Sequence, residues 1–187
     1  NFSFQQLTGN KTTNSFTIPR FLLTGLSWND LIFEQRLTAR QAILLNPTIN
    51  YTEPAERQRR NKNKSIFETL ADMNQVIRLD DLNIVDGKIN IKLNGGTEMK
   101  LDNATLSVES RSLLGSDKLS GIRRSVNNLN FSKGVFHIND YAIELNGVDY
   151  SGDKSKFRAA SVNVVNDSRQ IAARAQTVSM NEILINE

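Results

Sequence analysis

The sequence predicts a mainly β protein, built as a curved antiparallel sheet of bulged strands with one or two short helices. Three observations carry this prediction: an apolar spacing that recurs along the chain, turn signals between alternating segments, and a composition without long apolar runs. Alternation with period two is typical of a strand, because successive side chains point to opposite faces of a sheet. Short turns require antiparallel neighbours, so we expect a meander, folded over itself like a sandwich or left open as a groove.

The recurring spacing is a pair of apolar residues two positions apart, a two-residue gap, and a second such pair. Earlier copies begin at Phe21, Leu37, Ile77 and Met99. Because of the gap, the second pair lies an odd number of positions from the first. In a regular strand it would therefore point to the opposite face of the sheet. A β-bulge would bring both pairs onto one core, whereas ordinary strands with unrelated kinks are the alternative. Three consecutive copies end the chain: Ile143, Leu145, Val148, Tyr150; Phe157, Ala159, Val162, Val164; and Ala173, Ala175, Val178, Met180.

Composition limits the class of protein. The 187 residues have the length of one domain, 39% of them are hydrophobic, and there is no cysteine, so disulfides and His/Cys metal clusters are excluded. A net charge of +3 is too weak to predict binding to nucleic acid. No apolar run is long enough to span a membrane, and no signal peptide is visible. Because the chain starts at Asn1, we expect it to be a fragment of a longer protein.

The first part of the chain predicts strands around short helices. We expect strands over residues 15–28, 36–45 and 48–51, with Pro47 ending the second because proline has no amide to donate. Asn29 can cap one helical turn over residues 30–33. Residues 65–73 predict a second helix, since they combine a capping box with an apolar stripe that can pack on the sheet.

Residues 52–64 form the one clear stretch of low hydrophobicity, and they carry a run of charges. One interpretation is contact with anionic lipid headgroups or with an acidic partner. The alternative is a solvated connection without a binding role, which is the usual place of a charge run in a folded protein. The candidate contact residues are Arg57, Arg59, Arg60, Lys62 and Lys64.

Turn signals after residue 76 predict hairpins. Asp86-Gly87 is typical of a tight turn that needs positive φ, and Asn94-Gly95-Gly96 predicts the next turn. Residues 128–136 align with residues 81–89, 47 positions earlier, so we expect a second hairpin there. This similarity predicts an internal duplication of about residues 76–108 and 126–164, inside a single domain of residues 1–187.

Residues with catalytic potential are few. His137 is the only histidine, and we expect a structural or exposed role for it on a strand. Asp80, Asp81 and Asp86 flank a strand and a turn, where acidic residues are ordinary. The chain has no phosphate loop and no nucleophile elbow. The sequence therefore predicts a protein that is not an enzyme and that has no metal or cofactor site.

A longer pattern of strands and turns carries a resemblance. Residues 22–28 and 37–50 join a strand, a helical turn and a strand that ends in a proline step. A charged linker and a helix then lead to residues 82–89, and the strand pattern returns at residues 157–164. In this order of elements the chain resembles the periplasmic N-terminal part of AsmA-like proteins of the bacterial envelope, in the form found in the Bacteroidetes.

The resemblance implies a periplasmic module that is held to the inner membrane by an anchor outside this chain. It also implies a part in outer-membrane assembly and in moving phospholipid along an open β groove. The chain departs from the family in two ways, since it has no anchor and is shorter than a bridge between two membranes. It could instead be a terminal module of a longer chain.

Two functions fit the predicted sheet. A lipid-handling module needs an apolar concave face that is left open or filled by acyl chains. A structural or adhesive β module, which binds a protein or a glycan, would instead close its core and display polar loops. The same apolar side chains could simply pack on one another, as in any core. The candidates for a lipid-facing lining are Leu82, Ile84, Ile89, Ile91, Leu101, Leu106, Phe131, Ile143, Leu145, Val162 and Val178.

Overall fold

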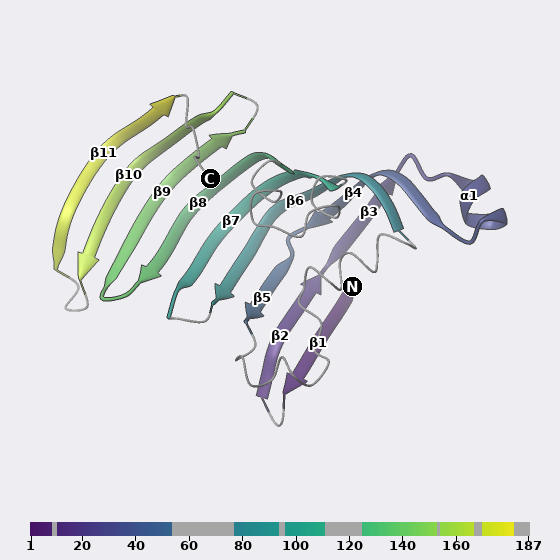
Figure 1. The fold of residues 1–187 in the computed structure, drawn as a ribbon, viewed down its shortest axis with the longest axis horizontal. Helices are drawn as coiled ribbons and strands as arrows, with labels where there is room; N and C mark the ends of the chain where they lie inside the picture. The colour runs from purple at the N-terminus through teal and green to yellow at the C-terminus, as the bar shows by residue number, and fades with distance from the viewer. Residues whose placement is uncertain are drawn as a thin grey trace.

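The described part of the chain forms one open sheet that carries one short helix (Figure 1). This computed structural model describes residues 1–8, 11–53, 77–93, 96–110, 125–152, 154–166 and 170–181. The sheet has eleven strands, and from β6 onward each strand pairs antiparallel with the next one in the sequence. The predicted fold class, a mainly β protein with a curved antiparallel sheet, is confirmed.

The bounds of the elements are close to those that the alternation predicts for most strands. In chain order they are β1 Phe2–Thr8, β2 Lys11–Ile18, β3 Arg20–Thr24, α1 Trp28–Phe33, β4 Leu37–Leu45, β5 Thr48–Thr52, β6 Ile77–Lys92, β7 Glu98–Glu109, β8 Val126–Ile138, β9 Tyr141–Ser151, β10 Lys156–Asn166 and β11 Ile171–Asn181.

Strand β6 joins the two halves of the sheet. One of its edges pairs in parallel first with β4 and then with β5, at the same offset. The ladder continues through the proline step, because the Asn46 amide donates to the Val85 carbonyl and the Lys88 amide to the Pro47 carbonyl, each at 2.8 Å. Strands β4 and β5 therefore pair with β6 as one continuous line, with Pro47 at the junction between them. The alternation alone does not predict this parallel pairing.

Two predicted boundaries near the helix are wrong. The helix begins at Trp28 and is capped by Ser27 instead of Asn29. The Ser27 hydroxyl accepts from the Asp30 amide at 3.3 Å and donates to the Asp30 carboxylate at 2.8 Å, so it satisfies an amide that the helix leaves unpaired. The long strand expected over residues 15–28 is divided at Pro19 into β2 and β3. The helix expected over residues 65–73 lies outside the described residues.

The hairpins predicted at Asp86-Gly87 and near Gly134 are also wrong. Strand β6 runs through the first pair, and β8 runs through Gly134. Asp86 has the positive φ that the turn signal predicts, 53°, but the chain continues forward and only shifts its register against β7 around Gly87. The local preference for positive φ is thus satisfied by a bend inside a strand. The two aligned segments are still alike in one respect, because each has a buried glycine where its strand bends.

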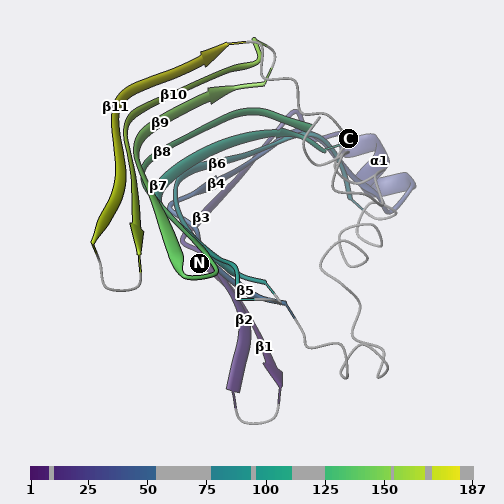
Figure 2. The ribbon, with the colours of Figure 1, turned by 60° about the vertical axis from the view of Figure 1, so that its left-hand side comes forward.

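A crease crosses the sheet at corresponding positions of its strands, and Figure 2 shows the strands bending there. Between β9 and β10 the pairing skips Gly147 and Ala160 while the register stays the same on both sides. Between β10 and β11 it skips Ala160 and Thr177 in the same way. Positive φ marks the crease at Asn46, just before β5, and within β6, β7, β9 and β11 at Asp86, Asn103, Gly147 and Thr177.

The prediction of a β-bulge is wrong for strands β9 to β11, which share a crease instead. A bulge would leave one extra residue on one strand of a pair. Here facing strands bend at facing residues, so the parity changes in all of them together and no register is lost at the bend. A second kink in β4 and β6 lies at Arg40 and Asp80, inside the copies of the motif that begin at Leu37 and Ile77.

The sheet bends toward its apolar face. Phe131 and Phe136 are five residues apart on β8, which in a straight strand is about 16 Å along the chain and on opposite faces. Their ring centroids nevertheless lie 6.5 Å apart. This contact is possible only if the strand changes parity and folds over between the two rings. The apolar side chains therefore line the inside of the bend.

The outer face is polar, and side-chain hydrogen bonds tie its strands together. The Asn90 side-chain amide donates to Asn50 at 2.7 Å, and Asn50 donates in turn to Ser15 at 2.9 Å, which links β6, β5 and β2. On the other half of the sheet, Asn146 donates to Ser161 at 2.9 Å. These three asparagines thus supply cross-strand contacts on the outer face of the sheet.

We predict that Gly134→Ala destabilises the fold by about 1–3 kcal/mol, because the bend leaves no room for a methyl group. An added Cβ would lie 2.5 Å from Cε2 of Phe131 and 3.1 Å from Cδ2 of Leu101. Urea denaturation measures the loss, and Phe131→Leu in the same chain should recover part of it. An unchanged free energy of unfolding would show that the Phe131 ring does not close over this backbone.

Candidate functional site

The hydrophobic core runs along the inside of the crease. Its buried members come from five neighbouring strands, β6 to β10, and are 7% exposed or less. Small residues stand where the backbones come closest, since Ala104 is fully buried and Ala159 is 3% exposed. The cluster consists of Ile84, Ile89, Leu101, Ala104, Phe131, Val148 and Ala159.

A second set of apolar side chains flanks this core on both arms of the bend. These residues pack on the cluster but are only half-buried. Among the described residues no second sheet covers them, and α1 packs mainly on β4 without burying any of its own residues. The flanking residues are Leu44, Ile49, Ile91, Met99, Leu106, Leu129, Phe136, Leu145, Phe157, Val162 and Val178.

The residues predicted to line a lipid-facing surface fall into three groups. Two of them, Leu82 and Ile143, are half-buried outside the cluster. Four belong to the buried core and contact one another: Ile84, Ile89, Leu101 and Phe131. Five are half-buried on the arms: Ile91, Leu106, Leu145, Val162 and Val178. The last group could contact a ligand without unfolding of the core, so the candidate site is centred on it.

Several residues of this surface were missing from the predicted lining. Val148, Ala159 and Phe157 occupy positions of the repeated motif, so the motif alone could have found them. Phe136 aligns with Ile89 in the duplicated segment, which was also a usable signal. Ile49 belongs to no copy of the motif, and only the pairing of β5 with β6 brings it to the core.

The residues predicted to contact lipid headgroups are not among those that the structure describes. Arg57, Arg59, Arg60, Lys62 and Lys64 lie outside the described residues. The contact of this loop with anionic lipid or an acidic partner therefore stays a prediction.

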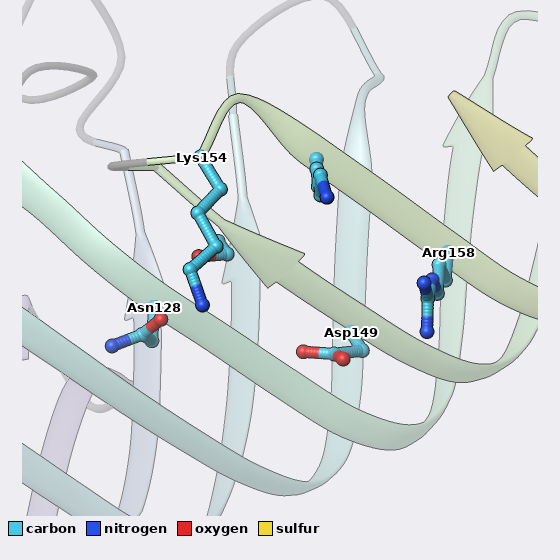
Figure 3. A pocket seen from close by; sticks show the side chains of 6 residues that line it. Asn128, Asp149, Lys154 and Arg158 are labelled. Atoms are coloured by element: carbon cyan, nitrogen blue, oxygen red, sulfur yellow. The ribbon is translucent and has the colours of Figure 1, made fainter. Parts of the chain in front are cut away.

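A shallow polar hollow lies on the outer face, at the turn between β9 and β10. Figure 3 shows Lys154 reaching from the turn toward Asn128, with Asp149 and Arg158 on the strands below. The hollow has a volume of about 310 Å³. Its charged side chains are exposed, and an acid stands among the bases. Such a surface holds solvated charges but no enclosed group prepared for chemistry. Its lining is Asn128, Asp149, Ser151, Lys154, Lys156 and Arg158.

A charge cluster lies at the end of the sheet where β6 passes to β7. The Glu98 carboxylate lies 2.7 Å from Nζ of Lys92 and 3.8 Å from Nζ of Lys100. His137 of β8 stands opposite Glu98 in the sheet. The hydrogen bond from Lys92, followed by the charges of Lys92, Lys100 and His137, lowers the pKa of Glu98 below its ordinary value of 4.5. The only histidine is thus part of a surface ion cluster on a strand.

The helix carries a second set of apolar side chains, which are exposed. Trp28 and Ile32 are both 65% exposed, and Phe33 is 78% exposed. Exposed aromatic side chains of this size are typical of contact surfaces for a partner.

Comparisons of the chain with protein-family models, with curated proteins and with solved structures found no match. Among the described residues, no group of three or more His, Asp or Glu side chains is placed to hold a metal ion. No helix in that part of the chain is long and apolar enough to cross a membrane.

We predict that Glu98→Gln lowers the free energy of unfolding at pH 7 by less than about 1 kcal/mol, because the ion pairs are largely exposed. The folded-state pKa of Glu98 is depressed, so its contribution is present above the unfolded value of 4.5 and is lost as the pH falls through the folded value. Urea denaturation of both proteins at pH 7 and at about pH 2.5 measures the difference. A difference that grows on acidification would contradict the assigned direction of the pKa shift.

Proposed function

We propose that the chain binds phospholipid acyl chains along the concave apolar face, as a non-catalytic module of the bacterial envelope. The observation that carries the proposal is a row of half-buried apolar side chains on both arms of the crease, with no second layer of described residues over them. Apolar surface left in water costs about 25 cal/mol per Å². An acyl chain would supply the missing layer.

The dimensions of the face suit an acyl chain. Neighbouring strands are about 4.8 Å apart, so the crease from β6 to β11 is roughly 24 Å long. One leaflet of a bilayer contributes about 15 Å of hydrocarbon thickness. Each CH₂ group that leaves water gains about 0.8 kcal/mol, so an acyl chain covered over half its length would bind measurably.

The cellular setting belongs to the same proposal. The resemblance to AsmA-like proteins supports a periplasmic location, an inner-membrane anchor outside this chain, and a role in outer-membrane biogenesis. The polar outer face, with its asparagine cross-links, suits a groove whose back is in water.

A second candidate function is binding of a protein partner through the helix. The observation in its favour is the exposed patch of Trp28, Ile32 and Phe33, because large aromatic side chains often dominate binding energy at protein interfaces. This function needs no ligand in the groove. It therefore predicts a purified protein that carries no lipid, and binding that is lost on Trp28→Ser with Phe33→Ser.

We predict that Leu145→Asn with Val162→Asn weakens binding of a fluorescent fatty acid by about tenfold or more. The two side chains face each other across β9 and β10 on the concave side, and their removal takes away roughly 2 kcal/mol of apolar contact. Fluorescence titration of the full chain measures the dissociation constant, and circular dichroism establishes that the variant is folded.

The matched control is Asp149→Asn with Arg158→Asn. These two residues also face each other across β9 and β10, but they are exposed on the outer face. The control should bind the fatty acid as the unchanged protein does. If the control loses binding and the Leu145, Val162 variant keeps it, the ligand sits at the polar hollow and the proposal is wrong.

A further inference from the structure

The last strand of the sheet, β11, has an outer edge without a pairing strand among the described residues. It is eleven residues long, and Arg174 is its only charged residue. From Ala172 to Thr177 every side chain is exposed. Natural proteins usually protect such an edge with charges, proline or a covering segment, because its free amides and carbonyls can pair with another strand.

A partner for this edge must bend where β11 bends. β11 changes parity between Gln176 and Thr177, and Thr177 has a φ of 53°. A straight strand would match one half of β11 and place its side chains on the wrong faces along the other half. Pairing over the whole edge is therefore restricted to a strand that bends at the facing position or next to it.

The repeated apolar motif is symmetric about its own centre, which makes it complementary to itself. An antiparallel neighbour with the same motif pairs its first position with the fourth and its second with the third. This is the observed arrangement inside the sheet, where Phe157 faces Met180 and Val162 faces Ala175. A second copy of β11 satisfies the same rule, with Ala173 opposite Met180 and Ala175 opposite Val178.

We propose that β11 pairs antiparallel with β11 of a second copy of this chain, in the register set by the motif. A two-fold axis passes between Gln176 and Thr177, so the bend at Thr177 of one strand lies one residue from the bend of the other. Arg174 then faces the uncharged Ser179 of the second copy, which avoids opposition of like charges. The dimer would join two concave faces into one groove and remove the exposed edge of each sheet.

Cysteine cross-linking tests this register, since the chain has no cysteine of its own. In the dimer, Cα atoms of opposite residues lie about 5 Å apart, within reach of a disulfide. Residue 173 of one copy and residue 173 of the other lie seven positions apart along the strands, about 23 Å in a straight strand and still far beyond disulfide reach across the bend. An equimolar mixture of Ala173→Cys and Met180→Cys chains should therefore cross-link on mild oxidation, whereas each variant alone should stay monomeric on a non-reducing gel.

Two variants at Ser179 give an independent measurement by sedimentation equilibrium. Ser179→Glu places a carboxylate opposite Arg174 of the second copy, and Ser179→Lys places a like charge there, each twice in the dimer by symmetry. The dissociation constant should fall by up to roughly tenfold in the first and rise by a similar factor in the second.

Three results would overturn the proposal. A sedimentation profile of a monomer up to about 100 μM, with no cross-linking in the mixture, would show that the edge does not associate. Cross-linking of either single variant alone would show a different register. Growth of open-ended filaments would show that β11 pairs with another edge, such as β1, instead of with itself.

Discussion

The structure depends on one constraint: the side chains of a β-strand alternate between the two faces of the sheet. A strand that bends must shift this alternation by one residue if its apolar side chains are to stay on the same face. In a flat sheet the second pair of each motif would point into solvent. The crease reverses the alternation in facing strands together, so both pairs reach the same core. Positive φ at residues such as Asp86, Asn103 and Gly147 supplies the local backbone change. Asparagine, aspartate and glycine adopt this conformation most readily, which explains why they stand there.

A crease shared by the strands from β6 to β11 also explains how a single sheet can have a core. The rings of Phe131 and Phe136 meet across the bend, and the glycine between them gives the ring of Phe131 its place. The cluster at the bend is buried, while flanking side chains such as Ile91, Leu145 and Val178 are only half-buried. The same geometry thus produces a core and, beside it, a set of half-buried apolar side chains. The proposed lipid binding uses the outer part of this gradient, so a ligand can enter without opening the core.

Much of this arrangement could be predicted from the sequence, since period-two alternation and the repeated gap identify the strands and the positions of the bends. The predicted cause was wrong in strands β9 to β11, because a gap of two residues does not distinguish a bulge in one strand from a bend shared by its neighbours. The Asp86-Gly87 signal misled for a related reason: positive φ is required both in a tight turn and in this crease. Ser27 was not predicted as the helix cap, because Asn29 is an equally good capping residue. Only the observed start of the helix at Trp28 distinguishes between them. The parallel pairing of β4 and β5 with β6 depends on long-range contacts that local patterns do not contain.

The most direct test of the open groove is to purify the chain without detergent from the bacterial periplasm, extract it with organic solvent and identify the extract by mass spectrometry. The account predicts phospholipid at about one molecule per chain, held by a protein whose circular dichroism shows a folded β sheet. A folded protein that is free of lipid, and that takes up none from phospholipid vesicles, would contradict it. The concave face would then be a core closed by other parts of the protein.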